Sequence, residues 1–104
     1  MLDRALVNGQ GRERALTLPY QVEFTPAARR QFRKLPAEAQ RRLAPVIDGL
    51  ADNPRPAGSK KLVGPSDLWR VRAGDFRVIY TIQDERLIVQ VVRVGNRREV
   101  YEYR

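Results

Sequence analysis

The sequence predicts a small α+β domain in which one strand is followed by two helices and then by three antiparallel strands. Three observations support this fold: alternating apolar residues at 20–24, helical spacing of apolar residues at 26–52, and runs rich in Val, Ile, Tyr and Trp after residue 67. We expect the strands to form one four-strand antiparallel sheet. Residues 1–18 show no periodic pattern and are expected to be a weakly ordered extension, which leaves residues 19–104 as the domain.

The two expected helices follow the first strand directly. Thr25 is a favoured N-cap residue, and Pro26 suits the first helical position. The residue before a proline avoids helical angles, so the first helix is expected to end before Pro36. The second helix is expected over residues 37–52, but Pro45 removes a backbone hydrogen bond inside it. We therefore expect a kink or a later helix start.

Three strands are expected after a long connection over residues 53–68. Their expected ranges are 68–73, 76–83 and 86–94. Gly74-Asp75 and Asp84-Glu85 separate them, and such pairs are typical of hairpin turns. The last two runs are apolar at both parities, which indicates central strands covered on both faces.

The composition excludes several classes of chemistry. The chain of 104 residues has no cysteine and no histidine, so it cannot form Cys-His zinc sites or Ser-His-Asp hydrolase sites. Its carboxylates show no metal-ligand spacing, and no cofactor is expected. No apolar run approaches the roughly 20 residues that span a bilayer, and the N-terminus lacks a secretory signal pattern. We expect a cytoplasmic protein without a membrane partner.

The net charge favours a polyanionic partner. Twenty Lys and Arg residues against 12 Asp and Glu give a formal charge of +8, which makes nucleic acid the first partner to consider.

The expected hairpin at Gly74-Asp75 concentrates this charge. A two-residue turn there places Arg72 directly opposite Arg77, with Arg70 on the same face. Because like charges at opposed positions destabilise a sheet, an anion is expected to bind between them. The alternative is that all three guanidinium groups reach solvent over an exposed face.

Further basic residues flank the expected sheet. After the last strand come Asn96, Arg97 and Arg98, and a tail that folds back could bring Arg97 and Tyr101 to the arginine face. Two lysines in the connection before the sheet are either phosphate-positioning cations or solvated loop charges: Lys60 and Lys61.

The order of these motifs resembles the RelE/ParE superfamily of type II toxins, over about residues 20–103. The most specific blocks are LWRVRAGDFRVIY at residues 68–80 and VGNRREVY at residues 94–101. They look more like the RelE branch, whose members cut messenger RNA in the ribosomal A site, than the ParE branch, whose members poison DNA gyrase. The resemblance implies the fold of RelE-like microbial ribonucleases.

The resemblance also implies an activity, a site and partners. The activity is ribosome-dependent, metal-independent cleavage of messenger RNA by attack of the 2′-hydroxyl on the adjacent phosphate. The implied catalytic residues are Arg70, Arg72, Arg77, Arg97 and Tyr101. Four others are expected to contact RNA: Lys60, Lys61, Asn96 and Arg98. The expected partners are a RelB-like antitoxin, the ribosome and messenger RNA, with operator DNA bound only through the antitoxin.

Two departures from the family pattern affect the expected base. Some relatives have a lysine that can lose its proton at a strand position, whereas Arg70 and Arg72 stay charged. Asn96 stands where many relatives carry histidine. Tyr101 is the remaining candidate base, because neighbouring arginines favour a phenolate. Two other functions stay open: a ParE-like gyrase inhibitor, and a catalytically inactive homologue that acts as a regulator.

Overall fold

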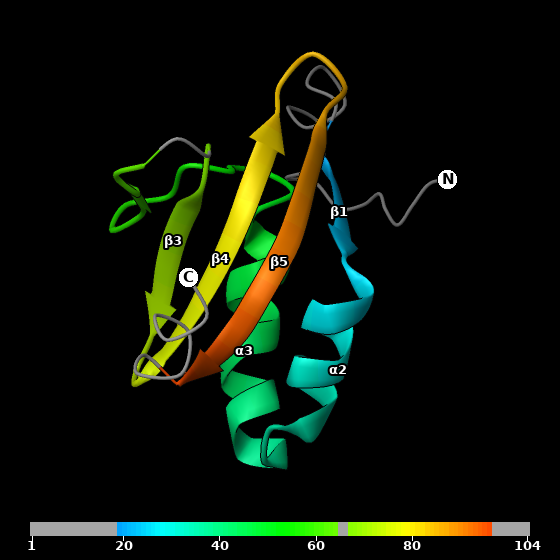
Figure 1. Cartoon of the computed structure of the whole chain (residues 1–104), viewed down its shortest axis with the longest axis vertical. Coiled ribbons are helices and arrows are strands. Elements are labelled where there is room, and N and C mark those ends of the chain that lie inside the picture. Colours follow the sequence, from blue (N-terminus) through cyan, green and yellow to red (C-terminus); the bar gives the residue numbers. More distant parts are fainter. Residues whose placement is uncertain (1–18, 65–66, 97–104) are drawn as a thin grey trace, which may run out of the picture.

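A computed structural model describes residues 19–64 and 67–96 and confirms the α+β fold (Figure 1). The expected extension at residues 1–18 lies outside the described residues, as do Arg97, Arg98 and Tyr101. The described elements are β1 (Gln21–Phe24), α2 (Pro26–Lys34), α3 (Ala37–Gly49), β2 (Lys60–Lys61), β3 (Trp69–Ala73), β4 (Phe76–Gln83) and β5 (Ile88–Asn96). No helix within the described ranges is long and apolar enough to cross a membrane.

The described strands form one five-stranded sheet in the order β1-β5-β4-β3-β2, and both helices lie on one of its faces (Figure 1). We call the other face the distal face. The expectation of four antiparallel strands is wrong in two respects. β1 runs parallel to β5, with Val22 opposite Val89, because the chain passes along the helices and enters the meander at the opposite edge of the sheet. β2 adds a fifth strand of two residues, which is too short to show an alternating pattern in the sequence.

The helices begin as the sequence predicts, but the second ends earlier. The Thr25 hydroxyl accepts a hydrogen bond of 3.1 Å from the backbone N–H of Ala28, and α2 starts at Pro26. α3 starts at Ala37, as expected, and continues through Pro45. The alternative expectation, a helix that starts later because of Pro45, is therefore wrong. Pro45 is exposed, and water can therefore solvate the carbonyl that the missing N–H leaves unpaired.

The hydrophobic core fills the space between the helices and the sheet. Leu43 and Ile47 of α3 belong to one buried cluster with Val78 and Tyr80 of β4. The Tyr80 side chain is fully buried, and its hydroxyl donates a hydrogen bond of 2.7 Å to the carbonyl of Pro54. Val78, Ile79 and Tyr80 are all buried in succession, which confirms that β4 is covered on both faces.

Three polar side chains connect the end of the sheet at the β4–β5 turn to the segment after α3. The guanidinium of Arg55 donates to both carboxylate oxygens of Asp84, at 3.3 and 2.9 Å, and stacks over the Trp69 ring at 5.2 Å. The Tyr20 hydroxyl donates to Asp84 at 2.5 Å. We call these three residues, Tyr20, Arg55 and Asp84, the Asp84 cluster.

The two hairpins differ in their turns. Ala73 pairs with Phe76, so Gly74-Asp75 is the expected two-residue turn, and Gly74 has a φ of 62°. The second turn is longer than expected: β5 begins at Ile88 and ends at Asn96, instead of spanning residues 86–94. Leu87 closes this turn with a φ of 56°, a conformation that the side-chain pattern does not reveal.

Replacing Gly74 with alanine is expected to lower the free energy of unfolding by about 1 kcal/mol, because a Cβ is strained at positive φ. An added Cβ would also lie 2.9 Å from Nη1 of Arg42, which can move aside. Urea denaturation measures the change. Gly49→Ala is the matched control, since nothing lies within 4 Å of its Cβ position and alanine suits a helix better than glycine. Equal stabilities for Gly74→Ala and the wild type would contradict the strained turn.

Replacing Asp84 with asparagine is expected to weaken the dependence of stability on acidic pH. A hydrogen bond from Arg55, and to a smaller extent one from Tyr20, holds the pKa of Asp84 below its ordinary value of 3.8. The carboxylate therefore stabilises the folded state above that value, and the contribution is lost as the pH falls through the folded-state pKa.

Urea midpoints measured between pH 2.5 and pH 7 test this dependence. The wild-type midpoint should fall more steeply with acid than that of Asp84→Asn. Glu85→Gln, in the same exposed turn, should retain the wild-type slope. Parallel profiles for the wild type and Asp84→Asn would show that the Asp84 cluster does not stabilise the fold.

Candidate anion-binding site

The register of the β3–β4 hairpin places three arginines on the distal face. Arg72 is directly opposite Arg77, as predicted, and Arg70 lies two residues before Arg72 on β3. Val71 and Val78, which have the opposite parity, belong to the core on the helix side. The side chains of Arg70, Arg72 and Arg77 therefore share the face away from the helices.

Two of these arginines are buried, and neither has a counter-ion among the described residues. Arg70 and Arg77 are each only 5% exposed, whereas Arg72 is exposed. Among the described residues, none of the three forms an ion pair or a side-chain hydrogen bond with another residue. The Nε atom of Arg77 is buried and has no hydrogen-bond partner. Since a buried unpaired cation is costly, this arrangement favours the anion site over three solvated guanidinium groups.

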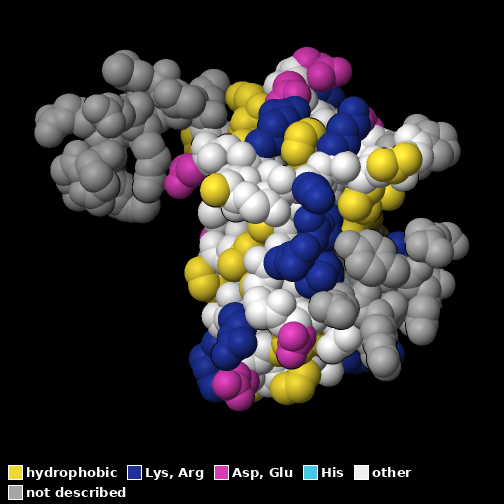
Figure 2. Space-filling model, turned by 90° about the vertical axis from the view of Figure 1, so that its left-hand side faces the viewer, with side chains coloured by type: hydrophobic (Ala, Val, Ile, Leu, Met, Phe, Trp, Pro, Cys, Tyr) yellow, Lys and Arg dark blue, Asp and Glu magenta, His cyan; other side chains and the backbone are white. Residues whose placement is uncertain are grey.

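Two more cations stand beside these arginines on the distal face. Lys60 of β2 is opposite Arg70, and Arg93 of β5 is opposite Ile79, which in turn is opposite Arg70. Figure 2 looks onto the side of the molecule where β3 lies and shows Lys and Arg side chains gathered through its middle. Lys60 is thus part of the strand edge beside the arginines, and not of an irregular loop.

Arg93 was not predicted as a site residue. The alternation of Val89 and Val91, both in the core, would place residue 93 on the helix side. A register shift between Ile79 and Tyr80 reverses this alternation and turns Arg93 to the distal face. In the sequence, the only indication of this bulge on β5 is that a charged residue, Arg93, stands where the alternation expects a core residue.

The other sequence-predicted residues are placed as follows. Lys61 is opposite Trp69 and so lies on the helix side of the edge, where its ammonium group pairs with Asp67 at 3.0 Å. Asn96 ends β5 opposite Phe76, at the same end of the sheet as the Gly74-Asp75 turn. Three candidates lie outside the described residues: Arg97, Arg98 and Tyr101.

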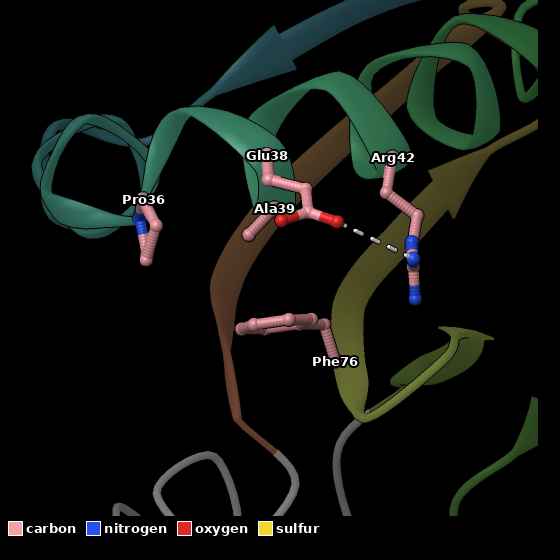
Figure 3. Close-up of a pocket in the computed structure, with 5 residues that line it drawn as sticks. All are labelled: Pro36, Glu38, Ala39, Arg42 and Phe76. Carbon is pink, nitrogen blue, oxygen red and sulfur yellow. Dashed lines mark ion pairs between the residues drawn. The ribbon is translucent and has the colours of Figure 1, made fainter.

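A small pocket of about 170 Å³ lies at this end of the sheet, between the start of α3 and β4 (Figure 3). Phe76 points toward Ala39, and Glu38 forms an ion pair of 3.9 Å with Arg42 at the rim. The pocket contains none of the predicted site residues, so the arginine face is a separate feature. No group of three or more acidic side chains within residues 19–64 and 67–96 could hold a metal ion.

The distal face can bind phosphate and stabilise charge that develops on it. Guanidinium groups offer paired N–H donors that match phosphate oxygens, and they remain protonated. Buried donors that are already fixed in place lose little entropy when the anion binds. The three arginines cannot accept a proton, so they supply electrostatic stabilisation.

Replacing Arg77 with methionine is expected to raise the free energy of unfolding by about 1 kcal/mol, because it removes a buried charge that has no counter-ion within residues 19–64 and 67–96, while keeping most of the side-chain volume. Thermal and urea denaturation of the full chain at low salt measure this change. Arg86→Met, at an exposed position in the turn after β4, should change stability by less than about 0.5 kcal/mol. A loss of stability in Arg77→Met would show that the Arg77 guanidinium supports the fold.

Comparisons with known proteins agree with this geometry. A family described as the ParE toxin of the type II toxin-antitoxin system parDE matches residues 22–101. A putative RelE-like toxin protein from Escherichia coli is 39% identical over 80 residues, which are 75% of this chain and 83% of the relative. The mRNA interferase toxin RelE of Escherichia coli is 30% identical over 88 residues, which are 81% of this chain and 92% of that protein.

The fold is also similar to a solved toxin-antitoxin complex. The crystal structure of RelBE2 from Mycobacterium tuberculosis superposes with a TM-score of 0.64 at 33% identity, over 77% of this chain and 93% of the solved one. The similarity to these toxins in sequence and in fold thus covers about three quarters of the chain or more. The chain therefore belongs to the RelE/ParE superfamily of type II toxins.

Proposed function

We propose that this toxin is a metal-independent endoribonuclease that cuts messenger RNA in the ribosomal A site. The observation that carries the proposal is the set of three arginines on the distal face, two of them 5% exposed, without a carboxylate partner in the described chain. Such a set is suited to a phosphate that gains charge during a reaction. The relative named mRNA interferase toxin RelE, at 30% identity, supports the same substrate.

The proposed reaction uses the RNA's own nucleophile. The 2′-oxygen attacks the adjacent phosphorus, its proton passes to a base, and the bond to the 5′-oxygen of the next nucleotide breaks as that oxygen gains a proton. The products are a 2′,3′-cyclic phosphate and a 5′-hydroxyl end. Arg72 and Arg77 stabilise the additional negative charge on the pentacoordinate phosphate, and Arg70 and Arg97 assist.

The base is the open part of this mechanism. The chain has no histidine, and arginine does not lose its proton in proteins. We assign the proton transfer to Tyr101, which neighbouring arginines would favour as a phenolate. Its ring could also stack on a base next to the cut.

Contacts to the RNA outside the cut linkage are assigned to four residues. Lys60 lies beside Arg70 on the distal face, which supports its role. Lys61 is already paired with Asp67 on the other side of the edge strand, so its contribution is expected to be smaller. Asn96 and Arg98 follow the last core position of β5 and complete the set.

The partners follow from this proposal and from the solved relatives. The RelBE2 structure is a toxin-antitoxin complex, and we propose a RelB-like antitoxin for this chain. A complementary acidic segment that folds on the basic toxin would neutralise the distal face. Operator DNA would then be bound through the antitoxin, and the ribosome would present the message.

A reconstituted translation reaction tests the proposal. With the wild-type toxin, primer extension should reveal new 5′ ends within A-site codons, and these ends should require the ribosome. Arg77→Met and Tyr101→Phe should each lower the cleavage rate by about 100-fold or more, because each removes a group that acts in the transition state. Arg86→Met, outside the site, should cut at the wild-type rate.

The second candidate function is inhibition of DNA gyrase, which the ParE description of the matching family favours. If the message stays intact and translation continues, endonuclease activity is contradicted. A supercoiling assay with purified gyrase then measures the alternative. Inhibition of translation without cleavage, unchanged in Arg77→Met, would point to a catalytically inactive homologue.

A further inference from the structure

The distal face carries a second row of cations next to the arginine pair. Lys60 is opposite Arg70, Arg70 is opposite Ile79, and Ile79 is opposite Arg93. Directly opposed residues project to the same side of a sheet. Three cations therefore stand in one line across β2, β3 and β5, with the Ile79 side chain between them. We call Lys60, Arg70 and Arg93 the second row.

The two rows have the spacing of neighbouring phosphates. Arg70 is two residues from Arg72 on β3, and Ile79 is two residues from Arg77 on β4. At the rise of an antiparallel strand, two residues span about 7 Å. Successive phosphates of an extended RNA strand are separated by a similar distance. A strand of RNA that runs along β4 would thus bring one phosphate over each row.

Burial within the second row points to a ligand. Arg70 is 5% exposed and forms no ion pair within the described part of the chain. Ile79, the residue opposite Arg70 on β4, is apolar and 2% exposed, so the strand position at the centre of the row carries no carboxylate. An external anion is the group that would balance Arg70.

We propose that the second row is a binding subsite for the phosphate next to the scissile one, and that Arg93 holds this phosphate together with Arg70. The proposal rests on the proposed function, since that function places the scissile phosphate over Arg72 and Arg77. Arg93 acts as a positioning residue: it aligns the RNA strand so that the cut linkage lies over the arginine pair. A phosphate contact of this kind is independent of the base sequence.

The test pairs Arg93→Gln with messages that carry one uncharged methylphosphonate linkage, either directly 5′ or directly 3′ of the cut. Arg93→Gln is expected to lower kcat/KM about tenfold on normal message, as for the loss of one charge-assisted hydrogen bond. One of the two uncharged linkages should cost the wild type a similar factor and cost Arg93→Gln nothing more. Arg93→Lys should recover most of the loss.

The matched control is Arg86→Gln, at an exposed position in the turn before β5. It should retain the wild-type kcat/KM and lose activity with the uncharged linkage just as the wild type does. Equal losses for the wild type and Arg93→Gln on both modified messages would overturn the subsite, as would a wild-type kcat/KM in Arg93→Gln. Melting temperatures of all variants are measured beside the kinetics, and an unfolded Arg93→Gln is replaced by Arg93→Lys and Lys60→Gln.

A binding measurement separates this proposal from the proposed function. A short oligoribonucleotide with 2′-O-methyl groups cannot be cut, and its affinity is measured as salt is raised. The plot of log K against log salt should lose about 0.7 of its slope in Arg93→Gln, the value for one phosphate of a single strand, and nothing in Arg86→Gln. If the wild type cuts no message but this slope changes, only the cleavage proposal fails. An unchanged slope overturns the second row.

Discussion

Two arginines held opposite each other across the β3–β4 hairpin are the constraint on which the rest of the structure depends. The two-residue turn at Gly74-Asp75 fixes this register, and the register forces Arg72 against Arg77. The backbone hydrogen bonds of the hairpin and the apolar burial on the helix side must therefore offset a like-charge contact on the distal face. A bound anion attracts both guanidinium groups. The arginine pair that destabilises the free protein therefore stabilises the complex with the anion.

Contacts elsewhere in the molecule hold the strands that carry Arg72 and Arg77 in place. Leu43 and Ile47 of α3 pack with Val78 of β4, the residue that follows Arg77, and so hold the strand from behind. The Asp84 cluster joins the opposite end of the sheet to the chain after α3 through hydrogen bonds to a single carboxylate. These stabilising contacts thus lie away from the three arginines of the distal face. This division is typical of functional sites.

The sequence predicts those features whose position depends on a local pattern. Thr25-Pro26 and Gly74-Asp75 each define a helix start or a turn within a few residues, and the hairpin register follows from the second by counting. Other features depend on distant parts of the chain. The parallel alignment of β1 and the pairing of Lys60 with Arg70 arise only when the sheet is assembled. The face on which Arg93 lies depends on a bulge beside Ile79. The burial of Arg70 depends on residues that are distant from it in the sequence.

The central claim is that the buried guanidinium of Arg77 binds a phosphate of the RNA. The most direct test of this claim is NMR of the arginine Nε–H groups. Addition of the uncleavable 2′-O-methyl oligoribonucleotide to the ¹⁵N-labelled toxin should shift the Nε–H signal of Arg77 and slow its exchange with water, because Nε gains the partner that it lacks in the free chain. Arg77→Met identifies the signal by its loss. An Arg77 signal that stays unchanged while those of other arginines shift would show that RNA binds elsewhere, and would contradict the account.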